Sequence, residues 1–233
     1  MSMNMLVLAG GFGTRLRAVV SKVPKSLAPV NGIPFLELQL KHWIAQGQDS
    51  FIFLLHYEAG QIIDFLIKNR KGFLYGISIE WIVECEPLGT GGAILNAIKE
   101  FDLKNDFLVV NSDTWLSSGL KVLRSASSPT IGIVKVQDSS RYGLVQFDDK
   151  LKVTGFSESF MNTTSTEESW INAGIYKLSA RFFKLERMKQ FSLESDMLVN
   201  GFGGTVLKAL KLDVDFIDIG VPRDYKKFCD LRK

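Results

Sequence analysis

Short apolar segments alternate with longer amphipathic ones along the first half of the chain. Four of the apolar segments have the length of a strand: 5–8, 51–55, 77–83 and 107–110. Three longer segments between or after them are predicted to be helices: 35–46, 58–68 and 89–101. Strands and helices that alternate in this way are typical of a largely parallel sheet with helices on both faces.

The pattern changes near Thr130, because strands then follow one another with few helices between them. Four further strands are predicted: 131–136, 144–147, 151–155 and 171–176. Residues 148–150 have the composition of a hairpin turn, so this half is expected to add antiparallel pairs. Three more helices, a short strand and a last helix are expected after them: 180–188, 193–200, 206–210, 216–219 and a helix from Pro222.

The predicted fold class is therefore α/β. We expect a three-layer α/β/α sandwich with a Rossmann-like, predominantly parallel mixed sheet and added antiparallel strands in the second half. No Pro/Ser-rich linker, repeat or low-complexity tract divides the sequence, so one domain is expected over 1–233. The polar segment 161–169, rich in Thr and Glu, is predicted to be a mobile loop, and such a loop beside an α/β site is often a lid.

Composition narrows the class of protein without indicating a function. With 46% hydrophobic and 23% charged residues, the chain falls in the ordinary globular class. The net charge is +3 and the basic residues are scattered among 25 acidic ones, so no nucleic-acid partner is expected. The longest apolar runs are too short to cross a bilayer and no charged leader precedes them, so we expect a cytoplasmic protein without a membrane partner.

The cysteines and histidines are too sparse to form a nucleophilic or metal-binding group. Cys85 and Cys229 have no partner at metal-ligand spacing, so both are predicted to be reduced packing residues. His42 falls in a predicted helix and His56 ends a predicted strand. Both histidines are interpreted as structural, because no Cys or Ser lies near enough in sequence to complete a nucleophilic system.

A glycine-rich loop follows the first strand and carries the strongest chemical signal. The sequence Ala9-Gly10-Gly11-Phe12-Gly13-Thr14-Arg15-Leu16 is followed by Lys25, between a proline and a serine. Glycines allow φ > 0 and bring backbone N–H groups close to a ligand, while an arginine and a lysine suit phosphate oxygens. A dinucleotide fingerprint would need a third spaced glycine at Leu16, and a P-loop would need Gly-Lys-Ser/Thr, so neither motif is present. A tight surface turn is the alternative for the glycines alone.

A second glycine-rich segment, 86–93, opens the predicted helix 89–101. Its free N–H groups could accept a phosphate or the edge of a base. The segment fits equally well a helix start that Thr90 caps, without any ligand.

Two aspartates follow apolar strands and indicate a metal site. Asp113 comes after the run 107–110, and Asp218 lies within Phe-Ile-Asp-Ile-Gly. Mg²⁺ usually takes one or two protein carboxylates and completes its octahedron with phosphate oxygens and water. The alternative for Asp113 is a helix N-cap, and spacing alone does not establish that the two aspartates meet.

These motifs together resemble the sugar-phosphate nucleotidyltransferases. The residues that carry the resemblance are the opening G-G-x-G-T-R-L with its downstream Pro-Lys, the Leu-Gly-Thr-Gly-Gly helix start, Asp113, and Phe-Ile-Asp-Ile-Gly-Val-Pro-x-Asp-Tyr. The resemblance runs from Met5 to about Tyr225. It is strongest to the short members that transfer GMP from GTP to D-glycero-α-D-manno-heptose 1-phosphate, which gives a GDP-heptose for polysaccharide biosynthesis and pyrophosphate.

The resemblance implies Mg²⁺ as cofactor, an NTP and a sugar 1-phosphate as partners, and a role for each matching residue. A nucleotide-binding half, about 1–115, precedes a sugar-binding half, about 116–233. The nucleotide would be held by Ala9, Gly10, Gly11, Gly13, Thr14, Arg15, Glu86 and Gly91. Catalysis would rest on Arg15 at the β and γ phosphates, Lys25 at the reacting phosphate, and Asp113. The metal would be held by Asp113 and Asp218, and the sugar by Gly143, Glu158 and Asn172.

Three positions depart from the family pattern. Ser26 replaces a common proline and Ser112 a common glycine, and both replacements are small. Ser159 stands where many members carry a lysine that meets the sugar phosphate, so that charge is either missing or supplied by Arg141 or Lys177.

Several alternatives remain at this stage. Another NTP and sugar pair, of the mannose, glucose or N-acetylhexosamine type, and a non-catalytic nucleotide-sugar binding protein stay open. A dehydrogenase is disfavoured by the absent third glycine and by the lack of an acidic residue after the second strand. The base, the sugar and the oligomeric state are not fixed by the sequence, and a homodimer is among the states left open.

Overall fold

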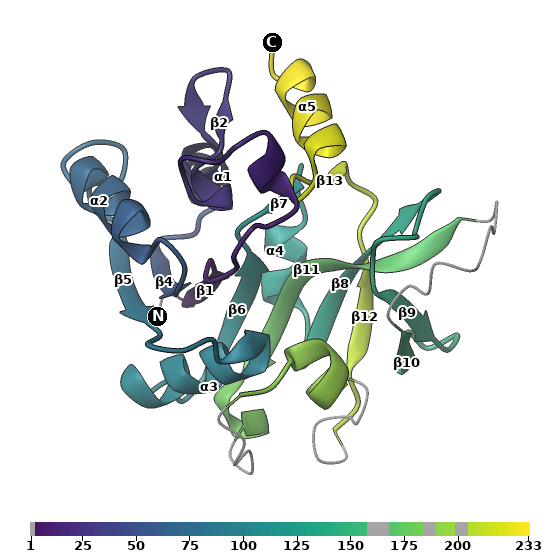
Figure 1. The fold of residues 1–233 in the computed structure, drawn as a ribbon. Helices are drawn as coiled ribbons and strands as arrows, with labels where there is room; N and C mark the ends of the chain where they lie inside the picture. The colour runs from purple at the N-terminus through teal and green to yellow at the C-terminus, as the bar shows by residue number, and fades with distance from the viewer. Residues whose placement is uncertain (1–2, 158–167, 184–189, 199–204) are drawn as a thin grey trace. The chain divides into compact units, whose positions relative to one another are not determined.

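The computed structural model describes residues 3–157, 168–183, 190–198 and 205–233, and it divides into two compact units (Figure 1). The first unit comprises Met1–Pro87, Val110–Leu120 and Asp215–Lys233, and the second comprises Leu88–Val109 and Lys121–Val214. The predicted halves, about 1–115 and 116–233, concern ligands rather than packing and stay a prediction.

Three parallel strands form the base of the first unit. They pair in the order β1 (Met5–Leu8), β4 (Ser50–Leu55) and β5 (Ser78–Val83). All six residues of β4 are buried, as are the first three of β1, which explains their continuous apolar sequence. Helix α1 (Phe35–Ala45) and helix α2 (Ala59–Asn69) fill the connections, and α2 packs on β5. The strand–helix order predicted for this part is confirmed.

Residues from three distant segments build one core in the first unit. Strand β7 (Thr114–Leu116) pairs antiparallel with β13 (Phe216–Asp218), and helix α5 (Pro222–Leu231) follows. The ring of Phe228 lies 5.2 Å from that of Phe35 and 5.3 Å from that of Trp115. Leu16, directly after the glycine-rich loop, is buried in the same cluster. The loop is therefore anchored to a core that the C-terminal segment completes. The short elements of this unit are η1 (Leu16–Ala18), η2 (Lys25–Leu27), β2 (Pro29–Val30) and β3 (Ile33–Pro34).

Antiparallel pairing dominates the second unit. Strand β11 (Ser169–Ser179) pairs antiparallel with β8 (Thr130–Val136) and with β9 (Leu144–Phe147), and β9 forms a hairpin with β10 (Val153–Ser157). The predicted change from parallel to antiparallel pairing is thus confirmed, and with it the mixed α/β class. The other elements are α3 (Gly89–Glu100), β6 (Asp106–Asn111, which ends in the first unit), α4 (Leu120–Ser125), η3 (Ala180–Phe183), η4 (Leu193–Leu198) and β12 (Lys208–Lys211).

One predicted helix is wrong. Residues 206–210 were expected to be helical, but Lys208–Lys211 form strand β12, which pairs in parallel with β8. Val206, Leu207 and Leu210 have spacing that suits a helix, but pairing with β8 satisfies the backbone and overrides this local preference. The strand expected at 151–155 begins at Val153, because Leu151 has a φ of 60° in the turn before it.

Other expectations extend beyond the described residues. Element η3 covers the start of the helix expected at 180–188, and η4, a π-helix, covers most of 193–200. Most of the loop predicted as a lid, 161–169, lies outside the described residues. Strand β7 and helix α4 were not predicted, since both are short. Among the described helices, none is long and apolar enough to cross a membrane.

Candidate active site

The three glycines of the loop after β1 have different surroundings. Gly13 has a φ of 62°, in the left-handed region that favours glycine. Gly10 has no such φ, but a Cβ on it would lie 3.2 Å from the Cβ of His56. A Cβ on Gly11 would meet nothing within 4 Å, and Gly11 is exposed. The expectation that all three glycines serve φ > 0 is therefore wrong, since only Gly13 of the three adopts it.

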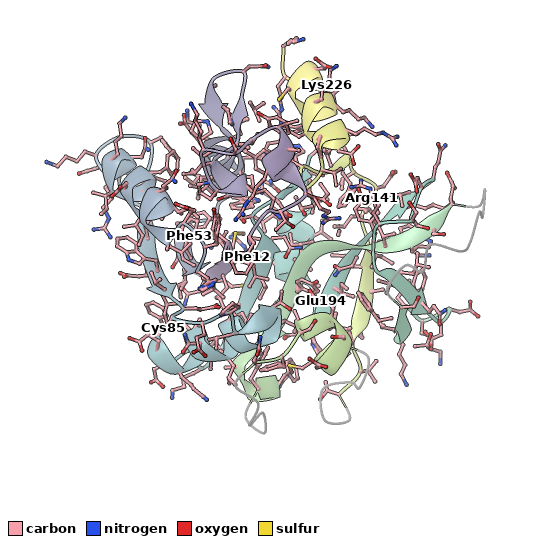
Figure 2. All side chains as sticks on the ribbon, in the orientation of Figure 1. Phe12, Phe53, Cys85, Arg141, Glu194 and Lys226 are labelled. Atoms are coloured by element: carbon pink, nitrogen blue, oxygen red, sulfur yellow. The ribbon has the colours of Figure 1, made fainter. Side chains whose placement is uncertain are left out.

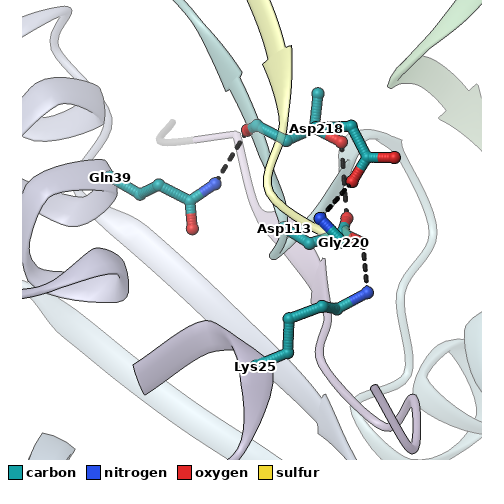
Figure 3. A network of polar contacts seen from close by, with 6 residues as sticks. Lys25, Gln39, Asp113, Asp218 and Gly220 are labelled. Atoms are coloured by element: carbon teal, nitrogen blue, oxygen red, sulfur yellow. Dashed lines mark hydrogen bonds and ion pairs between the residues drawn. The ribbon is translucent and has the colours of Figure 1, made fainter. Parts of the chain in front are cut away.

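Lys25 lies against this loop and forms an ion pair with Asp113 (Figure 3). A Cβ on Gly13 would lie 3.2 Å from the Cβ of Lys25, so the loop and the lysine are in close contact. The side chains of Lys25 and Asp113 are 19% and 17% exposed, so water only partly screens the pair. The structure thus brings two predicted site residues, 88 positions apart, into direct contact.

Asp113 directly precedes strand β7, and Asp218 is the last residue of strand β13, which pairs with β7. The N–H of Ile219 donates to the carbonyl of Asp113 at 2.9 Å, and Asp218 Oδ1 accepts a 2.7 Å hydrogen bond from the Gly220 N–H. Figure 3 shows the ammonium of Lys25 joined to Asp113, and Asp218 joined to Gly220. A strand rather than a helix follows Asp113, so the N-cap alternative is wrong.

Two carboxylates are too few for a metal site made of protein alone. Within the part of the chain that the structure describes, no group of three Asp, Glu, His or Cys side chains could hold an ion. A pair of carboxylates does fit Mg²⁺ when a phosphate substrate supplies further oxygens.

Arg15 stands at the start of η1 with helical backbone angles, and its side chain extends toward Gly220. A Cβ on Gly220 would lie 2.8 Å from Asp218 Oδ1 and 3.6 Å from Arg15 Nη2. A side chain at 220 would therefore collide with Asp218 and lie in ordinary van der Waals contact with the guanidinium. Gly220 is thus the residue that allows the arginine and the aspartate to approach the same point.

A small basic pocket adjoins the loop and contains residues that the sequence analysis missed. Arg17 and Lys22 line it together with Lys25. The guanidinium of Arg17 lies 4.4 Å from the ring centroid of Tyr57, and Phe12, labelled in Figure 2, packs tilted against the same ring at 5.5 Å. Tyr57 could have been found, because polar residues just past an apolar strand are candidates in α/β sheets; Arg17 gave no separate signal.

The remaining nucleotide-binding candidates of the first unit have simple environments. Ala9 is buried, and its N–H donates to the carbonyl of Leu54 at 3.0 Å, so β1 continues its ladder to this residue. Thr14 and Glu86 are exposed, in the loop and after β5 respectively.

Gly91, at the start of α3 in the second unit, has a packing reason to be glycine. A Cβ there would lie 2.2 Å from the ring of Phe191. The N–H groups of Gly91 and Gly92 donate to the carbonyl of Phe191 at 3.1 and 3.2 Å. Thr90 does not cap the helix, because its hydroxyl donates to Glu194 at 2.6 Å. The two glycine N–H groups are therefore already paired, and a nucleotide role for Gly91 stays a prediction.

Two of the sugar-binding candidates meet in the second unit. The N–H of Asn172 donates to the carbonyl of Gly143 at 2.9 Å, and a Cβ on Gly143 would strike the ring of Phe156 at 2.5 Å. Glu158, the third candidate, and Ser159 lie outside the described residues.

The two candidates for the missing positive charge differ sharply. Lys177 is 8% exposed and donates to the carbonyls of Arg124 and Ala126 at 2.8 and 2.7 Å, so it stabilises the fold. Arg141 is exposed and donates to the Tyr142 hydroxyl at 2.6 Å (Figure 2). Arg141 remains the better candidate of the two.

The histidines keep their structural interpretation, and one prediction on the cysteines is corrected. His56 packs against the glycine-rich loop at Gly10, and its Nδ1 donates to the carbonyl of Glu84 at 3.0 Å. The ring of His42 packs tilted against that of Trp115, with 4.5 Å between the centroids. Burial lowers the pKa of His42, and a hydrogen bond to the Leu116 carbonyl raises it by less. Both environments agree with a structural role. Cys229 packs on the core, but Cys85 is exposed, so its prediction as a packing residue is wrong.

Comparison with known proteins places these residues in context. Residues 4–225 match the family model described as nucleotidyl transferase. The chain is 34% identical, over 97% of its length and 98% of the relative's, to the D-glycero-alpha-D-manno-heptose 1-phosphate guanylyltransferase of Campylobacter jejuni. The enzyme of that name from Aneurinibacillus thermoaerophilus is also 34% identical, over 97% of this chain and 96% of its own. The crystal structure of HddC from Yersinia pseudotuberculosis complexed with GMP-PN is 35% identical, with a TM-score of 0.84 over 99% of this chain and 100% of its own.

Proposed function

The chain belongs to the nucleotidyl transferase family, and from this premise we propose that it is a guanylyltransferase that acts on a heptose 1-phosphate. GTP and D-glycero-α-D-manno-heptose 1-phosphate are the favoured substrates, because the two relatives that carry this activity in their names align with nearly the whole chain. The products are a GDP-heptose and pyrophosphate.

The reaction needs alignment and charge neutralisation more than acid–base chemistry. An oxygen of the sugar phosphate attacks the α-phosphorus of GTP, and the bond from that phosphorus to the bridging oxygen of the β-phosphate breaks. The attacking phosphate is already anionic, so no general base has to remove a proton. Catalysis then depends on holding two anions in line and stabilising the charge on the leaving pyrophosphate.

The residues around the loop after β1 fit these tasks. We assign the loop, from Ala9 to Thr14, to the triphosphate, with Arg15 at the β and γ phosphates. Lys25 is assigned to the phosphate that reacts, because an ammonium on a flexible stem can follow it through the reaction.

Asp113 and Asp218 are proposed to hold Mg²⁺, which would supply positive charge against the phosphates. Lys25 now supplies the positive charge next to Asp113. A divalent ion at that carboxylate would release the ammonium for phosphate oxygens, so the ion pair is compatible with both assignments.

The observation that carries this proposal is the contact of Lys25 with both the glycine-rich loop and Asp113. It puts a lysine, a carboxylate and a backbone turn within reach of one phosphate group. A surface turn without a ligand would give no reason to bury an ion pair beneath it.

The test is to mix the protein with Mg²⁺, pyrophosphatase, each of the common NTPs and a panel of sugar 1-phosphates, and to measure phosphate release. GTP with the heptose 1-phosphate is expected to give the highest kcat/KM. Turnover with another pair would correct the substrate and leave the class intact. Tight binding of GTP without turnover of any pair would instead favour a nucleotide-sugar binding protein.

Lysine variants show whether the turnover belongs to this site. Lys25→Ala should cut kcat by at least about 100-fold and change GTP affinity much less, because the contact strengthens in the transition state. Lys41→Ala, which removes an exposed lysine paired with Glu37 on α1, should leave both unchanged. Equal losses of kcat and affinity in the Lys25 variant would reduce its role to binding.

A further inference from the structure

A chain of hydrogen bonds in the second unit connects Asn172 to a carboxylate that the proposed chemistry does not use. The chain runs from Asn172 to Tyr176 on β11, and from Tyr176 to Glu194 on η4. Asn172 Nδ2 lies 2.5 Å from the Tyr176 hydroxyl oxygen, which lies 2.9 Å from Glu194 Oε1. Tyr176 is fully buried, so these contacts are the ones that satisfy its hydroxyl away from water.

An irregularity in β11 makes the first of these contacts possible. Residues four apart in a regular strand are separated by about 13 Å. Here the pairing with β8 shifts register between Asn172 and Tyr176, and Gly174 has a φ of 66° within the shift. The N–H of Gly174 turns back and donates to Asn172 Oδ1 at 2.9 Å.

Both ends of the Asn172 amide are therefore assigned. Its oxygen accepts from Gly174, so its nitrogen must face Tyr176 and donate to the hydroxyl oxygen. Among the described residues, no partner takes the second Nδ2 hydrogen or the second Oδ1 lone pair, so a ligand could use both.

Glu194 determines which group donates and which accepts in each of these hydrogen bonds. An ionised carboxylate only accepts hydrogen bonds, so the Tyr176 hydroxyl has to donate to it and to accept from Asn172. Burial and the charge of Glu194 raise the pKa of the Tyr176 hydroxyl well above its ordinary value, which keeps its proton in place. The other oxygen, Oε2, accepts from the hydroxyls of Thr90 at 2.6 Å and Ser192 at 3.1 Å. Glu194 (Figure 2) thus ties the start of α3 to the strand that carries Asn172.

We propose that Tyr176 and Glu194 are positioning residues that lock the Asn172 amide in the orientation that donates to a hydroxyl oxygen of the sugar 1-phosphate. The inference rests on the proposed function, because it takes Asn172 as a sugar contact. Without the Tyr176 hydroxyl, the Gly174 N–H alone would hold the amide at its oxygen, and the nitrogen would lose the acceptor that fixes its direction toward the sugar.

The test compares Tyr176→Phe, Asn172→Ala and the double variant in the phosphate-release assay. Tyr176→Phe keeps the ring in the core but removes the hydroxyl. Its KM for the sugar 1-phosphate should rise about tenfold, the cost of one misoriented hydrogen bond, while the KM for GTP changes less than twofold. Adding Tyr176→Phe to Asn172→Ala should have no further effect, because the residue to be oriented is gone.

A conservative variant separates orientation from simple packing. Glu194→Gln keeps an oxygen that can accept from Tyr176, and its amide nitrogen can donate to Thr90, so its sugar KM should stay near the wild-type value. Glu194→Met has no acceptor for the hydroxyl and should behave like Tyr176→Phe. Tyr225→Phe, which removes a hydroxyl that donates to the Pro29 carbonyl, is the matched control and should not change the sugar KM.

Three results would overturn the inference: a Tyr176→Phe effect that multiplies with that of Asn172→Ala, an equal rise in both KM values, or a Glu194→Gln variant as impaired as Glu194→Met.

A second measurement does not depend on turnover or on the variants folding. In the ¹⁵N spectrum of the wild type, one hydrogen of the Asn172 amide should exchange slowly with water, and fast exchange of both would refute the lock. If the wild type turns over no sugar 1-phosphate, the proposed function fails, while this spectrum still tests the lock.

Discussion

Alanine at Gly13 and at Gly11 should have very different consequences, although the sequence presents the two glycines alike. At Gly13 an alanine would hold a φ of 62°, which costs about 1–2 kcal/mol for a residue with a Cβ. Its Cβ would also lie 3.2 Å from that of Lys25, so one of the two has to move by a few tenths of an ångström. At Gly11 the new methyl group meets nothing within 4 Å.

The expected difference follows from adding these terms. Gly→Ala restricts the unfolded chain and stabilises by about 0.4–1 kcal/mol where the native backbone tolerates it, which applies at Gly11. Gly13→Ala loses more than this gain, so the two variants should differ by about 2 kcal/mol in the free energy of unfolding. Displacement of Lys25 by a few tenths of an ångström should also lower kcat about tenfold in the Gly13 variant.

Urea unfolding followed by circular dichroism measures the free energy of unfolding. Phosphate release at saturating GTP and sugar 1-phosphate measures kcat. Gly11→Ala serves as the matched control for stability, whatever it does to GTP affinity. The reasoning is refuted if the two variants unfold within about 0.5 kcal/mol of each other, a difference that ordinary surface substitutions produce.

Four further predictions concern charges in both units. Lys177→Met should lower the free energy of unfolding by about 2–4 kcal/mol, because it removes a buried ammonium from two carbonyls. Arg141→Met should leave the free energy of unfolding unchanged and raise the KM for the sugar 1-phosphate. If Arg141→Met instead lowered the free energy of unfolding and Lys177→Met raised this KM, the two roles would be reversed. Burial lowers the pKa of His42 below 6.5, so the stability its neutral form provides is present above that pH and is lost as the pH falls. The stability advantage of wild type over His42→Gln should therefore shrink from about pH 7.5 to about pH 5.5, and a constant advantage would contradict this. EDTA should abolish turnover and Mg²⁺ restore it, while Asp113→Asn should keep the fold and lose the response to Mg²⁺ in the same assay.

The pattern of apolar residues was sufficient to predict the strands that are buried on both faces. Strand β4 is apolar because all six of its residues are covered, so the run 51–55 has one simple interpretation. Strand β12 shows where this reasoning stops. It forms by pairing with β8, whose partner residues lie 78 positions earlier, and no local window contains that information.

Sequence motifs identified the residues of the loop but not their individual reasons. Gly10 lies against His56, and this contact joins segments that come together only in the folded chain, whereas the contact of Gly220 with Asp218 is local. The link from Asn172 to Tyr176 and Glu194 was invisible for the same reason. Its geometry depends on a register shift in β11, which a sequence pattern does not reveal.

The three-segment make-up of the first unit also bears on how the protein is synthesised. The ribosome completes Lys121–Val214, the larger part of the second unit, before it adds Asp215–Lys233. Ile217, Ile219 and Phe228, which close the core behind the glycine-rich loop, belong to that late segment. Leu16, Val20 and Phe35, the N-terminal members of this core, must therefore wait with apolar surface uncovered, although N-terminal regions usually fold first during translation. A nascent chain stalled near residue 214 should expose this surface to chaperones, whereas the second unit could already be compact.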